Sequence, residues 1–329
     1  MYGRSAYICP VYHFFMTKYR KHWRWLRNTA FGKIISDIVR GFEHDNPMLY
    51  GASIAFYTIF SLPALLIFTV FIAGIIFEQQ VVEGQIYYYI EELVGQASAR
   101  QIENILKNAA LDEARPIAKA IGIATLTFSA TTVFVNVQQA LNEIWGVRAK
   151  PRKGWLKLII DRLFSFLLVI SLGILLLGTI IIDTILSSFG NLLENFFSGY
   201  TVYLMQVTSS AVYVSIVTLV FLLIFKLLPD AQVRWRDVLV GAIVTTALFV
   251  VGKELIGVYL GATNFSSAYG AAGSLVVILI WVYYSAVIFL IGAEFTKAYS
   301  LRVGKEIRPK KNAVKVVKKE IEREVREAD

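Results

Sequence analysis

Long runs of apolar residues, separated by short polar segments, dominate this chain of 329 residues. Each run is long enough for a helix to cross the hydrocarbon core of a bilayer, which takes about 20 residues. We therefore predict an all-α fold, a polytopic membrane protein with six transmembrane helices. The spans are expected near residues 49–76, 117–141, 158–186, 204–228, 238–262 and 271–298.

Segments outside the spans have helical periodicity of their own. Apolar residues recur every three or four positions over 31–46, which predicts an amphipathic helix along the inner leaflet. Loop 78–116 is spaced in the same way and predicts a helical extracytoplasmic cap, and valines from Val314 to Val325 predict a short helix in the tail. The chain thus divides into a cytoplasmic or interfacial amphipathic arm, a six-helix membrane domain and a charged cytoplasmic tail, at residues 1–48, 49–298 and 299–329.

The charge of the segments between the spans changes sign along the chain. The first 50 residues carry eight Lys or Arg against three acidic residues, whereas loop 78–116 carries three against seven. Loop 146–157 has five basic residues and no acidic one, and the tail from Lys297 has eleven basic and six acidic residues. Because basic residues near the ends of spans stay in the cytoplasm, we expect both termini there.

Composition agrees with a membrane protein. Hydrophobic residues make up 56% of the chain, which is too apolar for an ordinary soluble domain. The net charge of +9 gathers at the predicted cytoplasmic ends, so topology explains it and no specific nucleic-acid partner is expected. Trp145 and Trp235 are expected to anchor span ends at the headgroups. The single cysteine, Cys9, excludes an internal disulfide, and the basic start lacks the apolar segment of a cleaved signal peptide.

Four blocks in a fixed order carry a family resemblance. They are Ala52–Phe68 in the first span, Asn142–Lys153 after the second, Phe225–Tyr259 across the fourth and fifth, and Ser267–Ser300, which contains Gly292-Ala293-Glu294. Together they resemble the YihY/BrkB family of bacterial inner-membrane proteins. The resemblance implies a multi-pass, six-helix protein of the inner (plasma) membrane. It implies little chemistry, since proposals for the family centre on solute export and resistance to host killing.

An old label of that family, ribonuclease BN, finds no support in the residues of this chain. Metal-assisted RNA hydrolysis needs clustered His, Asp or Glu, and the three histidines, His13, His22 and His44, have no metal-binding spacing. The sequence also lacks a Gly-rich phosphate loop, a Gly-x-Ser-x-Gly elbow and a Cys-x-x-Cys pair. We therefore expect no nuclease, ATPase or other enzyme activity, no metal and no cofactor.

Polar residues recur on one face of the second span. They follow one another at steps of three or four residues, which puts them on one side of a helix: Thr125, Ser129, Thr132, Asn136, Gln139 and Glu143. Polar groups that face lipid lack partners, so this face must meet protein or water. Two interpretations stay open, the wall of a hydrated solute path and hydrogen bonding that holds helices together.

The first span repeats the pattern with Ser53, Tyr57 and Ser61. Pro63 has no amide hydrogen, so it predicts a kink that frees the carbonyl of Ile59 toward the polar side. Packing of small residues beside a tolerated proline is the alternative. The candidates for a solute path are Ser53, Tyr57, Ser61, Thr132, Asn136, Gln139 and Glu143.

Ionisable residues inside the spans are candidates for coupling solute movement to an ion. Lys253 and Glu254 are adjacent in the fifth span, and we expect Glu254 to face inward because it shares a helix face with Gly257. Glu294, near the predicted cytoplasmic end of the last span, is the third candidate. An ion pair near the interface is the structural alternative for the first two. For Glu294 the alternative is a bridge to one of three arginines: Arg148, Arg234 and Arg236.

The leading hypothesis for function is a transporter or exporter of a small solute, coupled to an ion in one version. Its partners are the lipid bilayer and an unidentified small solute, and a homo-oligomer is left open. A structural protein of envelope integrity is one alternative, in which the polar stripe only joins helices. A lipid-handling, flippase-like protein is another, suggested by the basic inner face and the amphipathic arm. The sequence assigns neither the substrate nor the direction nor the coupling ion.

Overall fold

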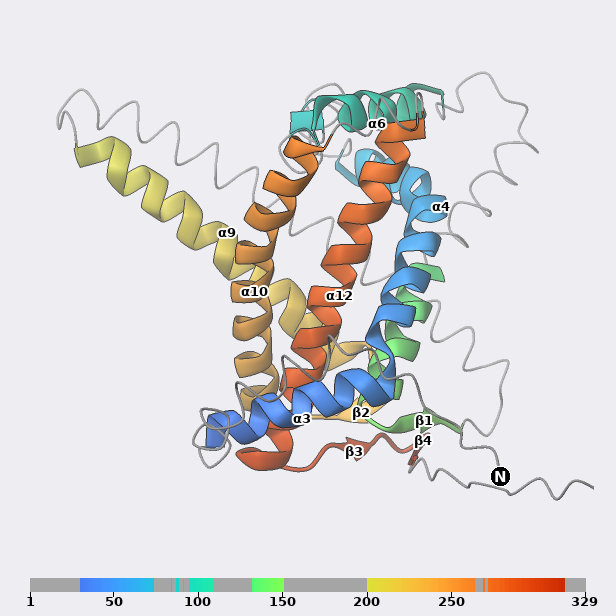
Figure 1. Cartoon of the computed structure of the whole chain (residues 1–329), viewed down its shortest axis with the longest axis vertical. Coiled ribbons are helices and arrows are strands. Elements are labelled where there is room, and N and C mark those ends of the chain that lie inside the picture. The colour runs from blue at the N-terminus through green and yellow to red at the C-terminus, as the bar shows by residue number, and fades with distance from the viewer. Residues whose placement is uncertain are drawn as a thin grey trace, which may run out of the picture.

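The computed structural model describes the chain at residues 30–73, 84, 87–88, 91, 95–108, 132–150, 200–263, 269 and 272–316. Four long helices form its body: α4 (Pro47–Ala73), α9 (Tyr200–Leu227), α10 (Trp235–Ala262) and α12 (Gly273–Arg302). Figure 1 shows α10, α12 and α4 side by side, while the N-terminal part of α9 leans away from α10. Residues 132–144 are helical and overlap the end of the second predicted span, whose earlier residues lie outside the described part.

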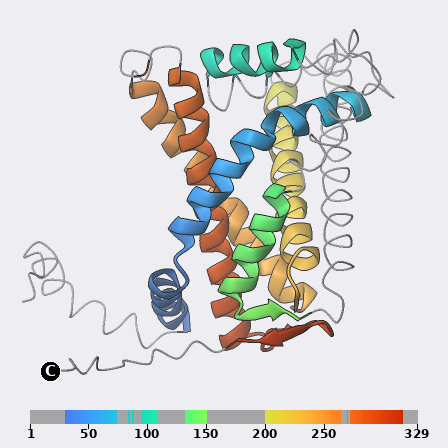
Figure 2. The ribbon, with the colours of Figure 1, turned by 90° about the vertical axis from the view of Figure 1, so that its right-hand side faces the viewer.

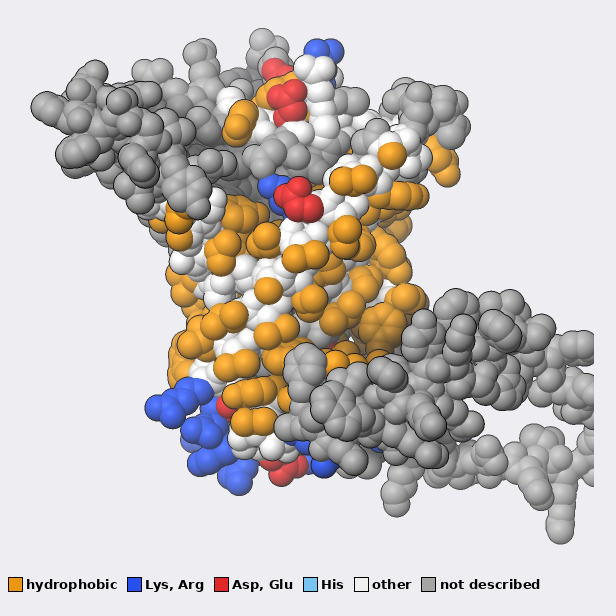
Figure 3. Space-filling view, turned by 60° about the vertical axis from the view of Figure 1, so that its left-hand side comes forward, with side chains coloured by type: hydrophobic (Ala, Val, Ile, Leu, Met, Phe, Trp, Pro, Cys, Tyr) orange, Lys and Arg blue, Asp and Glu red, His pale blue; other side chains and the backbone are white. Residues whose placement is uncertain are grey.

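Apolar side chains cover the length of this bundle. In the described part, three helices are long and apolar enough to cross a membrane: Val207–Leu227, Trp235–Leu260 and Gly273–Arg302. Figure 3 shows the resulting apolar band, with Lys and Arg side chains gathered at its lower end. These helices coincide with the last three predicted spans, whereas the span predicted near 158–186 lies outside the described residues.

Two helices lie across the ends of the bundle. The amphipathic helix α3 (Ala30–Asp45) crosses the lower end in Figures 1 and 2, which we call the α3 end. Asn46 adopts a left-handed conformation (φ 48°), which turns the chain sharply from α3 into α4. Helix α6 (Gln96–Asn108) crosses the opposite end. The predicted helices in the arm and in the loop 78–116 are therefore present, and the place of each along a membrane stays a prediction.

The tail joins two loops at the α3 end through short antiparallel strands. β1 (Val147–Ala149) pairs with β4 (Ala313–Lys315), and β2 (Ala231–Gln232) pairs with β3 (Arg308–Pro309). The predicted tail helix is thus wrong at Val314, which lies in β4. Val314 is β-branched and its backbone finds partners in the loop after residues 132–144, so pairing replaces the helix. Residues 317–329 lie outside the described part.

Helices α10 and α12 touch through two reciprocal glycine–threonine contacts. A methyl group built on Gly292 would overlap Thr245 Oγ1, and one built on Gly241 would overlap Thr296 Oγ1. Each threonine hydroxyl donates to the carbonyl of the glycine one turn earlier in its own helix, at 2.7 Å for Thr245 and 2.8 Å for Thr296. The hydroxyls are therefore satisfied without another helix, and both backbones approach closely, as small residues permit in membrane bundles.

An aromatic cluster fills the bundle near the α3 end. The rings of Phe225 and Phe289 stack with centroids 5.0 Å apart, and the Trp145 ring lies 6.2 Å from that of Phe225. Trp145 is 4% exposed, and its indole nitrogen donates to the carbonyl of Ala293 at 3.2 Å. The expectation that Trp145 anchors a headgroup layer is wrong, because its ring completes this core. Trp235 is 55% exposed, with the Lys226 ammonium over its ring.

Candidate functional site

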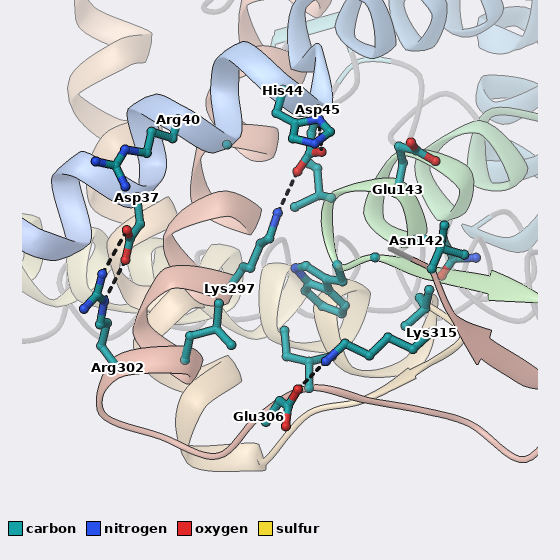
Figure 4. Close-up of a pocket in the computed structure, with 18 residues that line it drawn as sticks. Asp37, Arg40, His44, Asp45, Asn142, Glu143, Lys297, Arg302, Glu306 and Lys315 are labelled. Carbon is teal, nitrogen blue, oxygen red and sulfur yellow. Dashed lines mark hydrogen bonds and ion pairs between the residues drawn. The ribbon is translucent and has the colours of Figure 1, made fainter. Parts of the chain in front are cut away.

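A cavity of about 640 Å³ lies at the α3 end, and we call it the α3-end pocket. It is bounded by α3, the last turn of residues 132–144, the end of α12 and the tail (Figure 4). Trp145 and Val147 give it an apolar side. Nine ionisable residues line it: Asp37, Arg40, His44, Asp45, Glu143, Lys297, Arg302, Glu306 and Lys315.

Two ion pairs fasten α3 to α12 around this pocket. Arg302 binds Asp37 with two nitrogens, Nε to Oδ2 at 2.7 Å and Nη2 to Oδ1 at 3.0 Å. Lys297 Nζ binds Asp45 Oδ2 at 2.6 Å. The first pair is open to solvent and the Asp45 side chain is 7% exposed, so the second pair contributes more strongly to the position of α3.

A third ion pair closes the side of the pocket formed by the tail. Lys315 of β4 binds Glu306, and both side chains are exposed. The hydrogen bond from Lys315, and then its charge, hold the pKa of Glu306 below its usual value. This pair joins two parts of the tail on either side of β3, so it supports the strand pairing at the α3 end.

Glu294 is buried beside the pocket, where α3 packs against α12. Its side chain is 1% exposed, Oε2 lies 3.7 Å from Lys297 Nζ, and Oε1 has no hydrogen-bond partner in the described part. Gly41 of α3 lies against this carboxylate. The predicted bridge from Glu294 to an arginine is wrong, since the cation beside its carboxylate is Lys297. Those three arginines are exposed, whereas Glu294 is not: Arg148, Arg234 and Arg236.

Sequence reasoning missed Asp45 and Lys297 as site residues. Lys297 follows Glu294 by three positions, a spacing that places two side chains together on a helix and was visible in the sequence. Asp45 is 252 residues away from Lys297, so no local signal joins them. Among the described residues, no group of three His, Cys, Asp or Glu side chains is arranged to hold a metal.

The polar stripe of the second span divides among several partners. Asn136 accepts a hydrogen bond from Ser53 Oγ of α4 at 3.3 Å and donates to the carbonyl of Thr132 at 2.9 Å. Gln139 is exposed, and Glu143 lines the α3-end pocket. The structure therefore brings Ser53 and Asn136 together as a link between helices. Thr125 and Ser129 lie outside the described residues.

A second link uses two residues that flank the stripe. Asn142 Nδ2 donates to Asp230 Oδ2 at 2.8 Å, and the backbone amide of Asp230 donates to Asn142 Oδ1, also at 2.8 Å. Gln138 Nε2 donates to the same carboxylate at 3.4 Å. Residues 132–144 are thus clamped to the turn between α9 and α10. Asn142 also lines the pocket.

The polar residues of the first span do not line the pocket. Ser61 is buried, and its hydroxyl donates to the carbonyl of Tyr57 in its own helix at 2.9 Å. The Tyr57 side chain is exposed. Helix α4 continues through Pro63, and the kink expected there stays a prediction.

The charges of the fifth span lie away from the pocket, in α10. Lys253 Nζ sits 5.8 Å from the centre of the Tyr213 ring on α9. Glu254 is exposed, so the expectation that it faces inward is wrong. The inner face at this level is occupied by Gly252, against Ile288, and by the buried Ile256. Gly252 and Ile256 are each two positions from Glu254, a rotation of about 200° around the helix, which leaves Glu254 on the opposite, outer face.

Comparison with known proteins places the chain among bacterial membrane proteins. A UPF0761 membrane protein of Photobacterium profundum is 28% identical over 309 residues, which is 88% of this chain and 90% of that protein. One from Alteromonas mediterranea is 31% identical over 182 residues, which is 54% of this chain and 58% of that protein. One from Halorhodospira halophila is 29% identical over 67% of this chain and 46% of that protein.

The chain thus spans about half the length of two of these relatives and nearly all of the third. No solved structure matches this chain significantly. The family resemblance seen in four sequence blocks is confirmed, because a model of the family described as Virulence factor BrkB matches residues 38–316. This protein belongs to the BrkB family of bacterial membrane proteins.

Proposed function

We propose that this protein moves a small polar solute across the bacterial inner membrane and that the α3-end pocket is the entrance to its path. The observation that carries the proposal is a charged cavity of about 640 Å³ at the end of an otherwise apolar bundle. Its volume lies within the range of about 300–1,000 Å³ that is usual for sites of small molecules. Its lining carries charges of both signs, which suits a polar or zwitterionic solute.

The proposal places the α3 end in the cytoplasm, with six spans and both termini on that side. Lys and Arg side chains gather at this end (Figure 3). At the start of α10, Arg234 and Arg236 are both exposed. Such residues stay on the cytoplasmic side during insertion. The strands β3 and β4 hold the tail to the same end, which is consistent with a cytoplasmic C-terminus.

In this proposal α3 is the movable part of the entrance. It is fastened by the exposed pair of Asp37 with Arg302 and by the more buried pair of Asp45 with Lys297. Exposed ion pairs contribute little to stability, typically about 0–1 kcal/mol. One end of α3 is therefore held weakly. A small helix movement would widen the pocket without unfolding the bundle, and no chemical reaction by this chain is required.

A structural role is the second candidate, and the polar stripe together with the flanking Asn142 supports it. Asn136 and Asn142 each bind another element through hydrogen bonds of 2.8–3.3 Å. These contacts account for both amides without a solute path. In this alternative the polar residues join helices, and the α3-end pocket is a solvent-filled recess of the surface.

Transport into sealed vesicles separates the two candidates. Purified protein in liposomes is incubated with a bacterial metabolite extract, and the vesicle contents are analysed by mass spectrometry against protein-free liposomes. We expect at least one polar metabolite to accumulate. In a Cys9→Ser background, a bulky thiol reagent on Leu301→Cys, at the pocket, should block this accumulation, whereas the same reagent on Val251→Cys, on the exposed face of α10, should not. Equal contents with and without protein would favour the structural role.

A further inference from the structure

We infer that Asp45, Glu294 and Lys297 form a binding site for one monovalent cation, a proton or Na⁺. The charges of these three groups do not balance. Lys297 Nζ lies 2.6 Å from Asp45 Oδ2 and 3.7 Å from Glu294 Oε2, so one ammonium serves two carboxylates. At 3.7 Å the second contact is too long for a hydrogen bond. With both carboxylates ionised, the group carries one uncompensated negative charge.

Burial makes this imbalance costly. The side chains of Glu294 and Asp45 are 1% and 7% exposed. An uncompensated charge in such surroundings is strongly unfavourable and is normally neutralised by a partner or by a proton. Glu294 Oε1 is also buried without a hydrogen-bond partner in the described part. Glu294 thus lacks both a cation to balance its charge and a hydrogen-bond partner for one of its oxygens.

A proton or a Na⁺ ion would each neutralise the charge of Glu294 and give its carboxylate the missing partner. A proton on this carboxylate removes its charge and leaves Lys297 to Asp45 alone. A Na⁺ ion beside Oε1 instead balances the charge, with carboxylate oxygens as the hard ligands that such an ion prefers. The two carboxyl groups come from different helices, α3 and α12, so a cation between them also joins these helices.

Among the described residues, the other charged groups near the site do not pair with Glu294. His44 approaches Asp45 at 3.7 Å, Nδ1 to Oδ1, but its side chain is 55% exposed and it serves Asp45 rather than Glu294. The remaining charged groups line the pocket from α3, the end of α12, residues 132–144 and the tail, whereas Glu294 is not a lining residue. They are Asp37, Arg40, Glu143, Arg302, Glu306 and Lys315.

The α3-end pocket gives the cation a way in. Asp45 and Lys297 both line it, and Figure 4 shows Lys297 reaching from α12 toward Asp45 on α3. Glu294 does not line the pocket itself, but Gly41, which does, lies against its carboxylate. A side chain larger than hydrogen at position 41 would occupy the space beside this carboxylate.

The same site gives the cation a means to control α3. When the cation leaves, two buried carboxylates compete for Lys297, and repulsion between them loosens α3 from α12. That this loosening of α3 drives solute movement is a step that rests on the proposed function. Binding itself does not depend on transport.

Infrared difference spectroscopy of the full chain in detergent tests the binding. Spectra are recorded across a pH titration and across a NaCl titration, with choline chloride at matched ionic strength. A proton site predicts a protonated-carboxyl band that titrates with pH and ignores Na⁺. A Na⁺ site predicts that the carboxylate bands change when NaCl is added but not when choline chloride is added. It also predicts a titration midpoint that moves about tenfold in proton concentration for each tenfold rise in Na⁺.

Variants assign the signal to the site. Glu294→Gln should abolish it, and Asp45→Asn, which restores the charge balance with Lys297, should abolish it as well. Glu143→Gln changes a carboxylate of the same pocket that lies outside the site, and it should keep the signal. If wild type and both site variants give identical spectra in both titrations, the inference is wrong. A cation signal without solute uptake would instead overturn the proposed function alone, and uptake without a cation signal would overturn this inference alone.

Discussion

Gly41 of α3 lies directly against the carboxylate of Glu294 on α12, so closely that a methyl group on Gly41 would overlap Oε2. Through this contact α3 packs on α12 at Glu294, which is the buried acidic residue of that helix. The absence of a side chain at position 41 therefore sets the distance between α3 and the bundle.

Gly41→Ala should displace α3 from α12. Forcing extra atoms into a packed contact typically costs about 1–3 kcal/mol, and we expect a loss of this size in the free energy of unfolding in detergent. Gly84→Ala is the matched control, because a Cβ there meets nothing within 4 Å. Equal stability of the two variants would contradict the close contact of Gly41 with Glu294.

The contact of α10 with α12 makes a separate prediction. Gly292→Ala places a methyl group on Thr245 and should lower the free energy of unfolding by about 1–3 kcal/mol through overpacking. Gly257→Ala, in α10 with open space around its Cβ, should be neutral or slightly stabilising, since alanine favours helix. Combining Gly292→Ala with Thr245→Ala should recover part of the loss. Denaturant titration of all four proteins measures these effects.

Lys297 and Arg302 both hold α3, but in different surroundings. Lys297→Met removes the cation shared by two buried carboxylates, and a loss of about 3–5 kcal/mol is typical when one partner of a buried ion pair is removed. Arg302→Met breaks an exposed pair and should have a small effect, which high salt should reduce further. Thermal unfolding at low and high salt distinguishes the two. A larger loss of stability for Arg302→Met than for Lys297→Met would contradict the conclusion that the Lys297 pair is the more buried of the two.

Asn142, which flanks the polar stripe, and Gln139, which belongs to it, test whether these polar residues join helices. Asn142→Ala leaves Asp230 without two hydrogen bonds of 2.8 Å and should cost about 1–3 kcal/mol of stability. Gln139 is exposed, so Gln139→Ala should leave stability unchanged. Measured unfolding curves that coincide for these variants would show that the clamp to Asp230 contributes nothing.

Local patterns in the sequence predicted the elements of the fold well. The apolar runs predicted the helices α4, α9, α10 and α12. The spacing of apolar residues by three or four positions predicted α3 and the helix α6 in the loop 78–116. Both signals act within one element, where periodicity follows directly from helix geometry. The strands of the tail escaped prediction, because β4 depends on pairing with β1, and the paired residues Val147 and Lys315 lie 168 positions apart in the sequence.

The site was predicted only in part. Glu294 was a candidate because an ionisable residue in a span is costly, which is a property of one position. Its surroundings could not be predicted, since Asp45 reaches Lys297 only through the turn at Asn46 and the crossing of α3 over α12. Glu254 shows the opposite error. Its helix face was inferred from Gly257, whereas the packing of Gly252 on Ile288 determines the orientation of α10.

The most direct test of the account locks α3 to α12 and measures transport. In a Cys9→Ser background, Asp37→Cys and Arg302→Cys replace the exposed ion pair and are joined by a short cleavable thiol cross-linker. Uptake of the metabolite identified with liposomes is then compared before linking, after linking and after cleavage. We predict that uptake stops on linking and returns on cleavage, because α3 must move to open the pocket. Uptake that continues unchanged through the linked protein would contradict a path that enters beneath α3.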